Sequence, residues 1–267
     1  MGVDGSATSL AAVESAAREA DRMGVELRLA YACGWPVGRV APGVPPWDPG
    51  GIRGHGSADA GLAEAGRRAR SVAPGVRVTR TVLMGEPAAV LETESHRASL
   101  TVVGSRTATR VGGGRRGSVA ARLAVRGGSP VLMVRGGRDP DGPVVLACDG
   151  GQVGRQAAAF AFAEASTRGT DVVVLNGFAA RDGAPEGRAR DPLAALRELY
   201  PDVAVYRRRV RGGTRRAVVE ASTSAQLVVI GTRPRAGWNA ALPATVSRAA
   251  LRQAGCSVAV IPEQRTR

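Results

Sequence analysis

Strands and helices are predicted to alternate along the chain, because short apolar runs are separated by stretches whose apolar residues recur every three or four positions. Residues 100–103 (LTVV) form a strand-like run, whereas residues 6–23 place Leu10, Val13 and Ala17 on one helical face. In the first half, this pattern predicts strands at 25–32, 76–83, 100–103 and 131–134 and helices at 6–23, 57–72, 87–96 and 119–126. Such alternation indicates an α/β fold, a parallel sheet with helices on both faces.

The same pattern occurs twice. Asp4-Gly5 recurs as Asp149-Gly150, and the run LTVVGSR at 100–106 recurs as QLVVIGTR at 226–233. The offset falls from about 145 to about 127 positions, because the first half carries extra residues in a Gly/Pro-rich loop at 34–56. An internal duplication follows, with a polar linker at 136–142 between domains 1–136 and 143–262. Such copies are expected to pack as a pseudo-twofold pair.

The first strand is predicted to be short. Residues 1–6 (MGVDGS) match only the end of the apolar strand in residues 143–150 (PVVLACDG). A strand clipped in this way, either biologically or by the choice of start codon, loses hydrogen bonds to its neighbours and weakens the sheet.

A glycine-rich loop after residues 100–103 is the candidate binding element. Gly112, Gly113, Gly114 and Gly117 precede Ser118, a residue type suited to cap the following helix. Free backbone N–H groups at the positive end of a helix dipole bind phosphate without a dedicated side chain. The alternative is that the glycines only let a long loop turn, since glycine makes up 36 of the 267 residues.

Composition narrows the function classes. The net charge is +14 and every basic residue is arginine, but aromatic residues make up only 3%. Nucleic-acid binding is disfavoured, because the arginines are scattered and stacking aromatics are scarce. Cys33, Cys148 and Cys256 are far apart, which argues against a disulfide framework or a zinc site. No run reaches the length of a membrane span, so a cytoplasmic protein is expected.

Together these motifs resemble the universal stress protein family. The resemblance rests on the VDGS opening, the Gly85-Glu86-Pro87 turn, and the spacing from Gly104 to Gly117-Ser118 in the loop. It implies two tandem, Rossmann-like, open five-stranded parallel sheets with helices on both faces. It further implies that the first domain binds ATP. The Asp4 carboxylate could in addition hold a Mg²⁺ ion that bridges the phosphates, although one carboxylate beside arginines is a thin basis for turnover.

The resemblance also implies a set of nucleotide-binding residues. They comprise the aspartate after strand 1, a backbone position at the end of strand 2 and the phosphate loop, namely Asp4, Ala32, Gly104, Thr107, Gly117, Ser118 and Val119. Thr107 stands where the family has its second loop glycine. In the second half, Asp149, Gly231 and Thr245 persist, but Pro234 and Ala244 replace loop glycines, so this half is expected to be a structural partner without tight nucleotide binding.

Three functions remain open from the sequence. The first is a nucleotide-binding stress or signalling module that is not an enzyme, with adenine nucleotide as ligand and further homodimerisation as an additional contact. The second is a slow ATPase, although His55 and His96 are the only histidines and no P-loop or catalytic triad is present. The third is a purely structural pairing domain.

Overall fold

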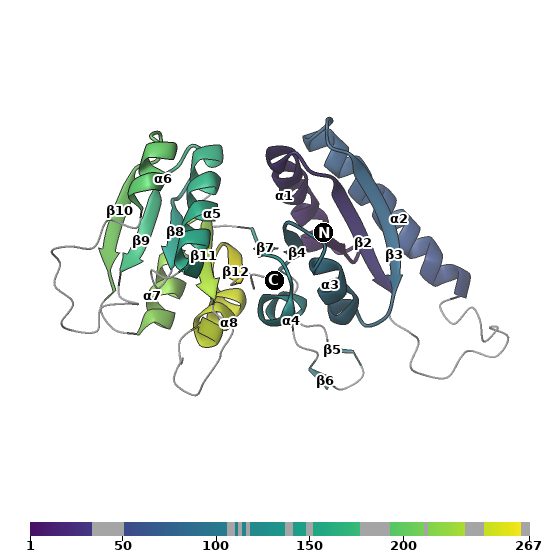
Figure 1. Cartoon of the computed structure of the whole chain (residues 1–267). Helices are drawn as coiled ribbons and strands as arrows, with labels where there is room; N and C mark the ends of the chain where they lie inside the picture. Colours follow the sequence, from purple (N-terminus) through teal and green to yellow (C-terminus); the bar gives the residue numbers. More distant parts are fainter. Residues whose placement is uncertain are drawn as a thin grey trace. The chain divides into compact units, whose positions relative to one another are not determined.

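The computed structural model divides the chain into two compact units, Met1–Gly128 and Ser129–Arg267. It describes residues 1–33, 51–105, 110–111, 114–115, 118–136, 141–147, 152–176, 193–210, 213–232 and 243–262. Figure 1 shows the strands and helices of both units.

The first unit holds six strands and four helices among its described residues. They are β1 (Gly2–Val3), α1 (Ala7–Met23), β2 (Leu27–Cys33), α2 (Gly51–Val72), β3 (Val78–Met84), α3 (Pro87–Ser95), β4 (Thr101–Gly104), β5 (Arg110–Val111), β6 (Gly114–Arg115) and α4 (Val119–Arg126). The helices pack in two pairs, α1 with α2 and α3 with α4. Right-handed crossovers in a parallel sheet place one such pair on each face.

Within its described residues, the second unit repeats this succession without the two short strands of the loop, and it has one additional strand before the repeated order and one after it. Its elements are β7 (Val131–Val134), β8 (Val144–Ala147), α5 (Gln152–Arg168), β9 (Val172–Asn176), α6 (Ala194–Leu199), β10 (Val205–Arg209), α7 (Thr214–Ala221), β11 (Leu227–Thr232), α8 (Pro243–Gln253) and β12 (Ser257–Pro262). By sequence β7 closes the first repeat, yet it lies in the second unit, where it pairs with β12.

The α/β Rossmann-like architecture is confirmed, but the prediction of two five-stranded sheets is wrong. One sheet has three strands, in the order β1-β2-β3, and the other has seven, in the order β10-β9-β8-β11-β12-β7-β4. Strand β2 pairs in parallel with β1 and β3 in the smaller sheet, and β10-β9-β8-β11-β12 is a parallel series in the larger one. Strand β12 pairs with β7 antiparallel. The short hairpin β5-β6 lies in the glycine-rich loop.

The length of β1 explains the different sheet sizes. In the second unit, β8 forms a ladder with β11 that starts at Val144 and Val145, opposite Leu227 and Val228. In the first unit, β1 consists of only two residues, and it forms a ladder with β2 but none with β4. The predicted short first strand is therefore confirmed, and its consequence is a sheet divided between β1 and β4.

One predicted loop is partly helical. Residues 34–56 were expected to be irregular, but α2 begins at Gly51, so His55 lies in this helix. Glycine weakens a helix by about 1 kcal/mol without forbidding it, and the last proline of this stretch is Pro49. Residues 34–50 lie outside the described part of the chain.

Candidate functional site

Asp4 holds a turn at the carboxyl end of β1. Its Oδ1 atom accepts hydrogen bonds from the Ser6 backbone N–H at 3.0 Å and from the Ser6 hydroxyl at 2.6 Å. Ser6 is the N-cap of α1, and its hydroxyl oxygen accepts from the Ser9 N–H at 3.3 Å. The exposed carboxylate of Asp4 therefore fixes the start of α1 at the edge of the sheet where the resemblance places the nucleotide.

Gly104 lies directly against the first turn of α1. A Cβ atom at this position would stand 2.8 Å from the Thr8 carbonyl oxygen and 2.9 Å from the Ser9 nitrogen. These distances are too short for a methyl group, so only glycine lets the end of β4 and the start of α1 approach this closely. The same contact brings Gly104 next to the turn that holds Asp4.

Ala32 lies near the carboxyl end of β2, the strand that pairs with both β1 and β3. The Ala30 N–H donates to the Met1 carbonyl oxygen at 2.9 Å, so the backbone groups of Ala30 face β1. Because backbone groups alternate along a strand, those of Ala32 face the same side, one step beyond Tyr31, the last β2 residue that pairs with β1. Ala32 thus presents main-chain groups near the carboxyl end of β2, as predicted.

Ser118 and Val119 mark the start of α4. Ser118 occupies the N-cap position of α4, as predicted, but its side chain forms no capping hydrogen bond. Ion pairs anchor the helix to the start and body of α3, since Arg122 contacts Glu86 at 2.9 Å and Glu92 at 2.8 Å. The hydrogen bond to Glu92 raises the pKa of Arg122.

The described residues bring part of the predicted set together. Asp4 and Gly104 meet through the first turn of α1, and Ala32 lies on the neighbouring strand β2. Ser118 and Val119 start α4, which follows the loop after β4. Thr107 and Gly117 lie outside the described residues, as do Asp149 and Pro234 of the second half. In the second half, α8 begins at Pro243, so Ala244 and Thr245 lie within its first turn.

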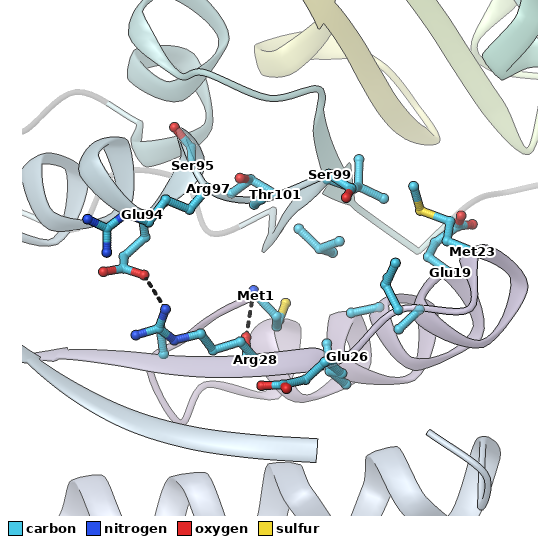
Figure 2. A pocket seen from close by; sticks show the side chains of 18 of the residues that line it. Met1, Glu19, Met23, Glu26, Arg28, Glu94, Ser95, Arg97, Ser99 and Thr101 are labelled. Carbon is cyan, nitrogen blue, oxygen red and sulfur yellow. Dashed lines mark hydrogen bonds and ion pairs between the residues drawn. The ribbon is translucent and has the colours of Figure 1, made fainter. Parts of the chain in front are cut away.

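The cavity in the first unit is not at this site. It has a volume of about 300 Å³ and lies at the amino ends of β2 and β4, beside Met1 and the last turns of α1 and α3 (Figure 2). The candidate residues lie at the carboxyl ends of the same strands. Among the described residues, no three His, Cys, Asp or Glu side chains are grouped as metal ligands, and no helix is long and apolar enough to cross a membrane.

Two structural features escaped the sequence analysis. Arg122 joins α4 to α3 through an ion pair with Glu86. In the sequence, the Gly85-Glu86-Pro87 turn marked the start of α3 but did not indicate a partner for Glu86. Ser95 and Ser222 form matching hydrogen bonds in the two repeats, each to a glycine N–H at 2.9 Å. Their signal was available, since the two serines are 127 positions apart, the offset of the later part of the repeat.

Comparison with known proteins identifies the family. The universal stress protein family model matches residues 1–135 and 142–262. Universal stress protein Rv2005c of Mycobacterium tuberculosis is 30% identical over 281 residues, which covers 97% of this chain and 95% of that protein. A universal stress protein structure from Archaeoglobus fulgidus has a TM-score of 0.68 at 16% identity and covers 98% of this chain and 94% of that one, which supports the fold alone.

A solved universal stress protein in complex with cAMP matches 51% of this chain and 93% of its own, at 28% identity. Its TM-score is only 0.39, so its ligand is stated for that protein alone. The family match spans both repeats and the M. tuberculosis relative spans nearly the whole chain. The chain belongs to the universal stress protein family.

Proposed function

We propose that the first repeat binds an adenine nucleotide at the carboxyl ends of β1, β2 and β4, and that the chain acts in stress response or signalling through this occupancy. Ligands in open parallel sheets bind where the strand order reverses. That point lies between β1 and β4, which are in contact although no ladder joins them. Asp4 and Gly104 flank it.

The observation that carries the proposal is the hydroxyl of Ser118, which makes no capping hydrogen bond within the described part of the chain. It stands at the N-cap of an eight-residue helix without capping it. The free N–H groups of the first turn and this hydroxyl can donate together to a phosphate oxygen. Phosphates at the start of α4 and an adenine near Ala32 would require one extended ligand that reaches from β2 to α4.

ATP is the nucleotide that the family resemblance favours, and Mg²⁺ could accompany it at Asp4. The Asp4 Oδ1 atom already accepts two hydrogen bonds from Ser6. A metal ion bound by Asp4 would therefore share this carboxylate with the N-cap residue of α1. The loop between β4 and α4 also carries Arg106, Arg110, Arg115 and Arg116, which offer further charge for the phosphates, but their side chains lie outside the described part of the chain. We propose binding without turnover, and cytoplasmic location remains part of this proposal.

A structural role is the second candidate, and a specific observation favours it. Asp4 is needed for the turn before α1, and Gly104 is needed for the close contact with Thr8, whether or not a ligand binds. A universal stress protein with a decayed site would keep these two residues. Ligand measurements, rather than these two residues, therefore decide between the candidates.

The test uses the full chain and two matched variants. We expect ATP to co-purify, detected by mass spectrometry after denaturation, and to bind the stripped protein in isothermal titration. Ser118→Ala should weaken ATP affinity by about 1 kcal/mol, roughly fivefold, since one hydrogen bond is lost. Thr245→Ala, the counterpart in the second repeat, should leave affinity unchanged.

Each alternative has its own outcome. No binding at millimolar ATP in the full chain would support the structural role. Steady-state phosphate release above a no-protein blank would support the slow ATPase. Equal losses from Ser118→Ala and Thr245→Ala would show that the binding site is not confined to the first repeat.

A further inference from the structure

A series of hydrogen bonds joins the two ends of the proposed nucleotide site in the first repeat. It starts at Cys33, the last residue of β2 and the neighbour of Ala32. The Gly85 N–H donates to the Cys33 carbonyl oxygen at 2.8 Å, so the turn between β3 and α3 is fixed to the end of β2. Gly85 has a φ of +140°, and a Cβ atom there would stand 2.7 Å from the Val90 side chain of α3, so this turn requires glycine.

Glu86, the next residue, connects this turn to two helices. Its carboxylate caps α3 by accepting from the Ala88 N–H at 3.2 Å and from the Ala89 N–H at 2.9 Å. The same carboxylate accepts from the Arg122 guanidinium of α4 at 2.9 Å. Glu86 is therefore shared between the start of α3 and the first half of α4.

Arg122 completes the connection at the phosphate end of the site. Its backbone N–H donates to the Ser118 carbonyl oxygen at 3.1 Å, which closes the first turn of α4. Its Nη1 atom donates to Glu86, and its Nε atom donates to Glu92 at 2.8 Å. A planar guanidinium that is bound at two of its nitrogen atoms has a fixed orientation. The first turn of α4 is thus tied to α3 and, through Gly85, to the end of β2.

The second repeat lacks this connection. At the offset of 127 positions, the three side chains that form it in the first repeat are replaced by Gly213, Val219 and Ala249. Gly213 is the N-cap of α7 and provides no capping side chain. The hydrogen bonds of Ser95 and Ser222, by contrast, are present in both repeats. The connection is therefore confined to the repeat that we propose to bind the nucleotide.

We propose that Arg122 is a positioning residue for the nucleotide, an inference that rests on the proposed function. Held by Glu86 and Glu92, it keeps the first turn of α4 at a fixed distance from the carboxyl end of β2. An extended ligand gains affinity when both of its subsites are held in the bound geometry beforehand. Arg122 therefore favours adenine nucleotides that carry phosphates over adenosine, without contacting the phosphates itself.

Direct attraction between Arg122 and the phosphates is the alternative, and the charges of the cluster distinguish the two. Arg122 contributes one positive charge, whereas Glu86 and Glu92 contribute two negative ones. If charge alone mattered, removing one carboxylate would strengthen ATP binding, because an anion would be repelled less. If Arg122 acts by positioning, the same change weakens ATP binding.

The test titrates the full chain with ATP and with adenosine. Arg122→Gln should lower ATP affinity at least about fivefold and adenosine affinity less than about twofold, because only the phosphate subsite loses its fixed position. Arg126→Gln is the matched control, since it removes the same charge from the same helix at an exposed residue that has no ion pair among the described residues. The control should change ATP affinity by less than about twofold, because an exposed charge is screened by salt.

Two carboxylate variants supply the test of sign. Glu86→Gln and Glu92→Gln should both weaken ATP binding, and Glu92→Gln does so with the cap of α3 intact. All variants should unfold at urea concentrations close to that of the unaltered chain, because exposed ion pairs stabilise little. A shift in urea midpoint together with equal losses for ATP and adenosine would show a merely structural role.

Tighter ATP binding in the two carboxylate variants would overturn the proposal, and so would equal ATP losses in Arg122→Gln and Arg126→Gln. An unaltered chain that binds neither ligand would overturn the proposed function itself, and the role of Arg122 with it. Failure of the function is thus seen in the unaltered chain, and failure of this inference alone is seen only in the variants.

Discussion

Gly104 has a structural reason to be glycine before any ligand is considered. The carbonyl oxygen of Thr8 and the nitrogen of Ser9 lie where its Cβ atom would stand. A side chain at this position has to push the first turn of α1 away from β4. Because Ser6 and Asp4 are held on that turn, a substitution at position 104 would also displace the candidate site.

Gly104→Ala should lower the free energy of unfolding by about 1–3 kcal/mol without any nucleotide present, because the added methyl group meets backbone rather than a movable side chain. Urea unfolding followed by circular dichroism measures this. Gly75→Ala is the matched control, since nothing lies within 4 Å of its Cβ position and the backbone there is not left-handed. Equal stability of the two variants would show that α1 shifts at little cost.

The candidate site was predictable from the sequence only in part. Asp4 and Ser118 were found because short motifs placed them after a strand and before a helix, and both positions are confirmed. The contact between Gly104 and Thr8 was not predictable, because it joins residues 96 positions apart through the packing of α1 on the sheet. The same holds for Arg122 and its partner Glu86.

At the level of elements, a buried serine joins a helix end to a glycine in each repeat. The Ser95 hydroxyl donates to the Glu92 carbonyl oxygen and accepts from the Gly128 N–H. The Ser222 hydroxyl donates to Val219 and accepts from Gly255 in the same way. Both serines are 1% exposed, so water cannot replace these bonds. Each serine fixes the loop that leads from α4 or α8 into the next strand.

Ser95→Ala and Ser222→Ala should each lower the free energy of unfolding by about 1–3 kcal/mol, because each leaves a buried glycine N–H without its acceptor. The double variant should lose the sum, since the two sites lie in different units and share no partner. Urea or thermal unfolding measures all three. Ser71→Ala, an exposed serine that also bonds to a helix carbonyl, should change stability by less than about 0.5 kcal/mol.

A loss at Ser71 as large as at Ser95 would contradict this interpretation, because water would then fail to replace the Ser71 hydroxyl as the donor to the Arg68 carbonyl oxygen. A loss at only one of the two buried serines would show that the repeats use this bond differently.

At the level of the whole molecule, the internal duplication was the strongest sequence prediction, and the fold class followed from it. Apolar periodicity is local, so it predicted which residues form strands and helices. The number of strands in each sheet depends on hydrogen bonds between distant segments. The division between β1 and β4 and the place of β7 beside β12 were therefore not predictable from periodicity.

Strand β7 should stabilise the second unit although it belongs to the first repeat by sequence. Its residues Val131, Leu132 and Met133 are 0–2% exposed and pair antiparallel with β12. The Arg135 guanidinium, which follows β7, donates to the Leu251 carbonyl oxygen at 3.0 Å and to that of Ala254, at the end of α8. Removing β7 would thus uncover the edge of β12 and leave the end of α8 without its donor.

A fragment of residues 129–267 should therefore unfold at higher urea than one of residues 143–267, with a difference on the order of 3 kcal/mol or more, the scale of one or two large buried side chains. Both fragments retain β8 to β12, but the shorter one also lacks Gly142, whose carbonyl oxygen accepts hydrogen bonds from Thr170 and Gln226. The difference therefore reports on β7, Arg135 and these two hydrogen bonds together. Circular dichroism in urea measures the two midpoints. Equal midpoints would mean that β12 is stable at the edge of its sheet, and β7 would then depend on the second unit without stabilising it.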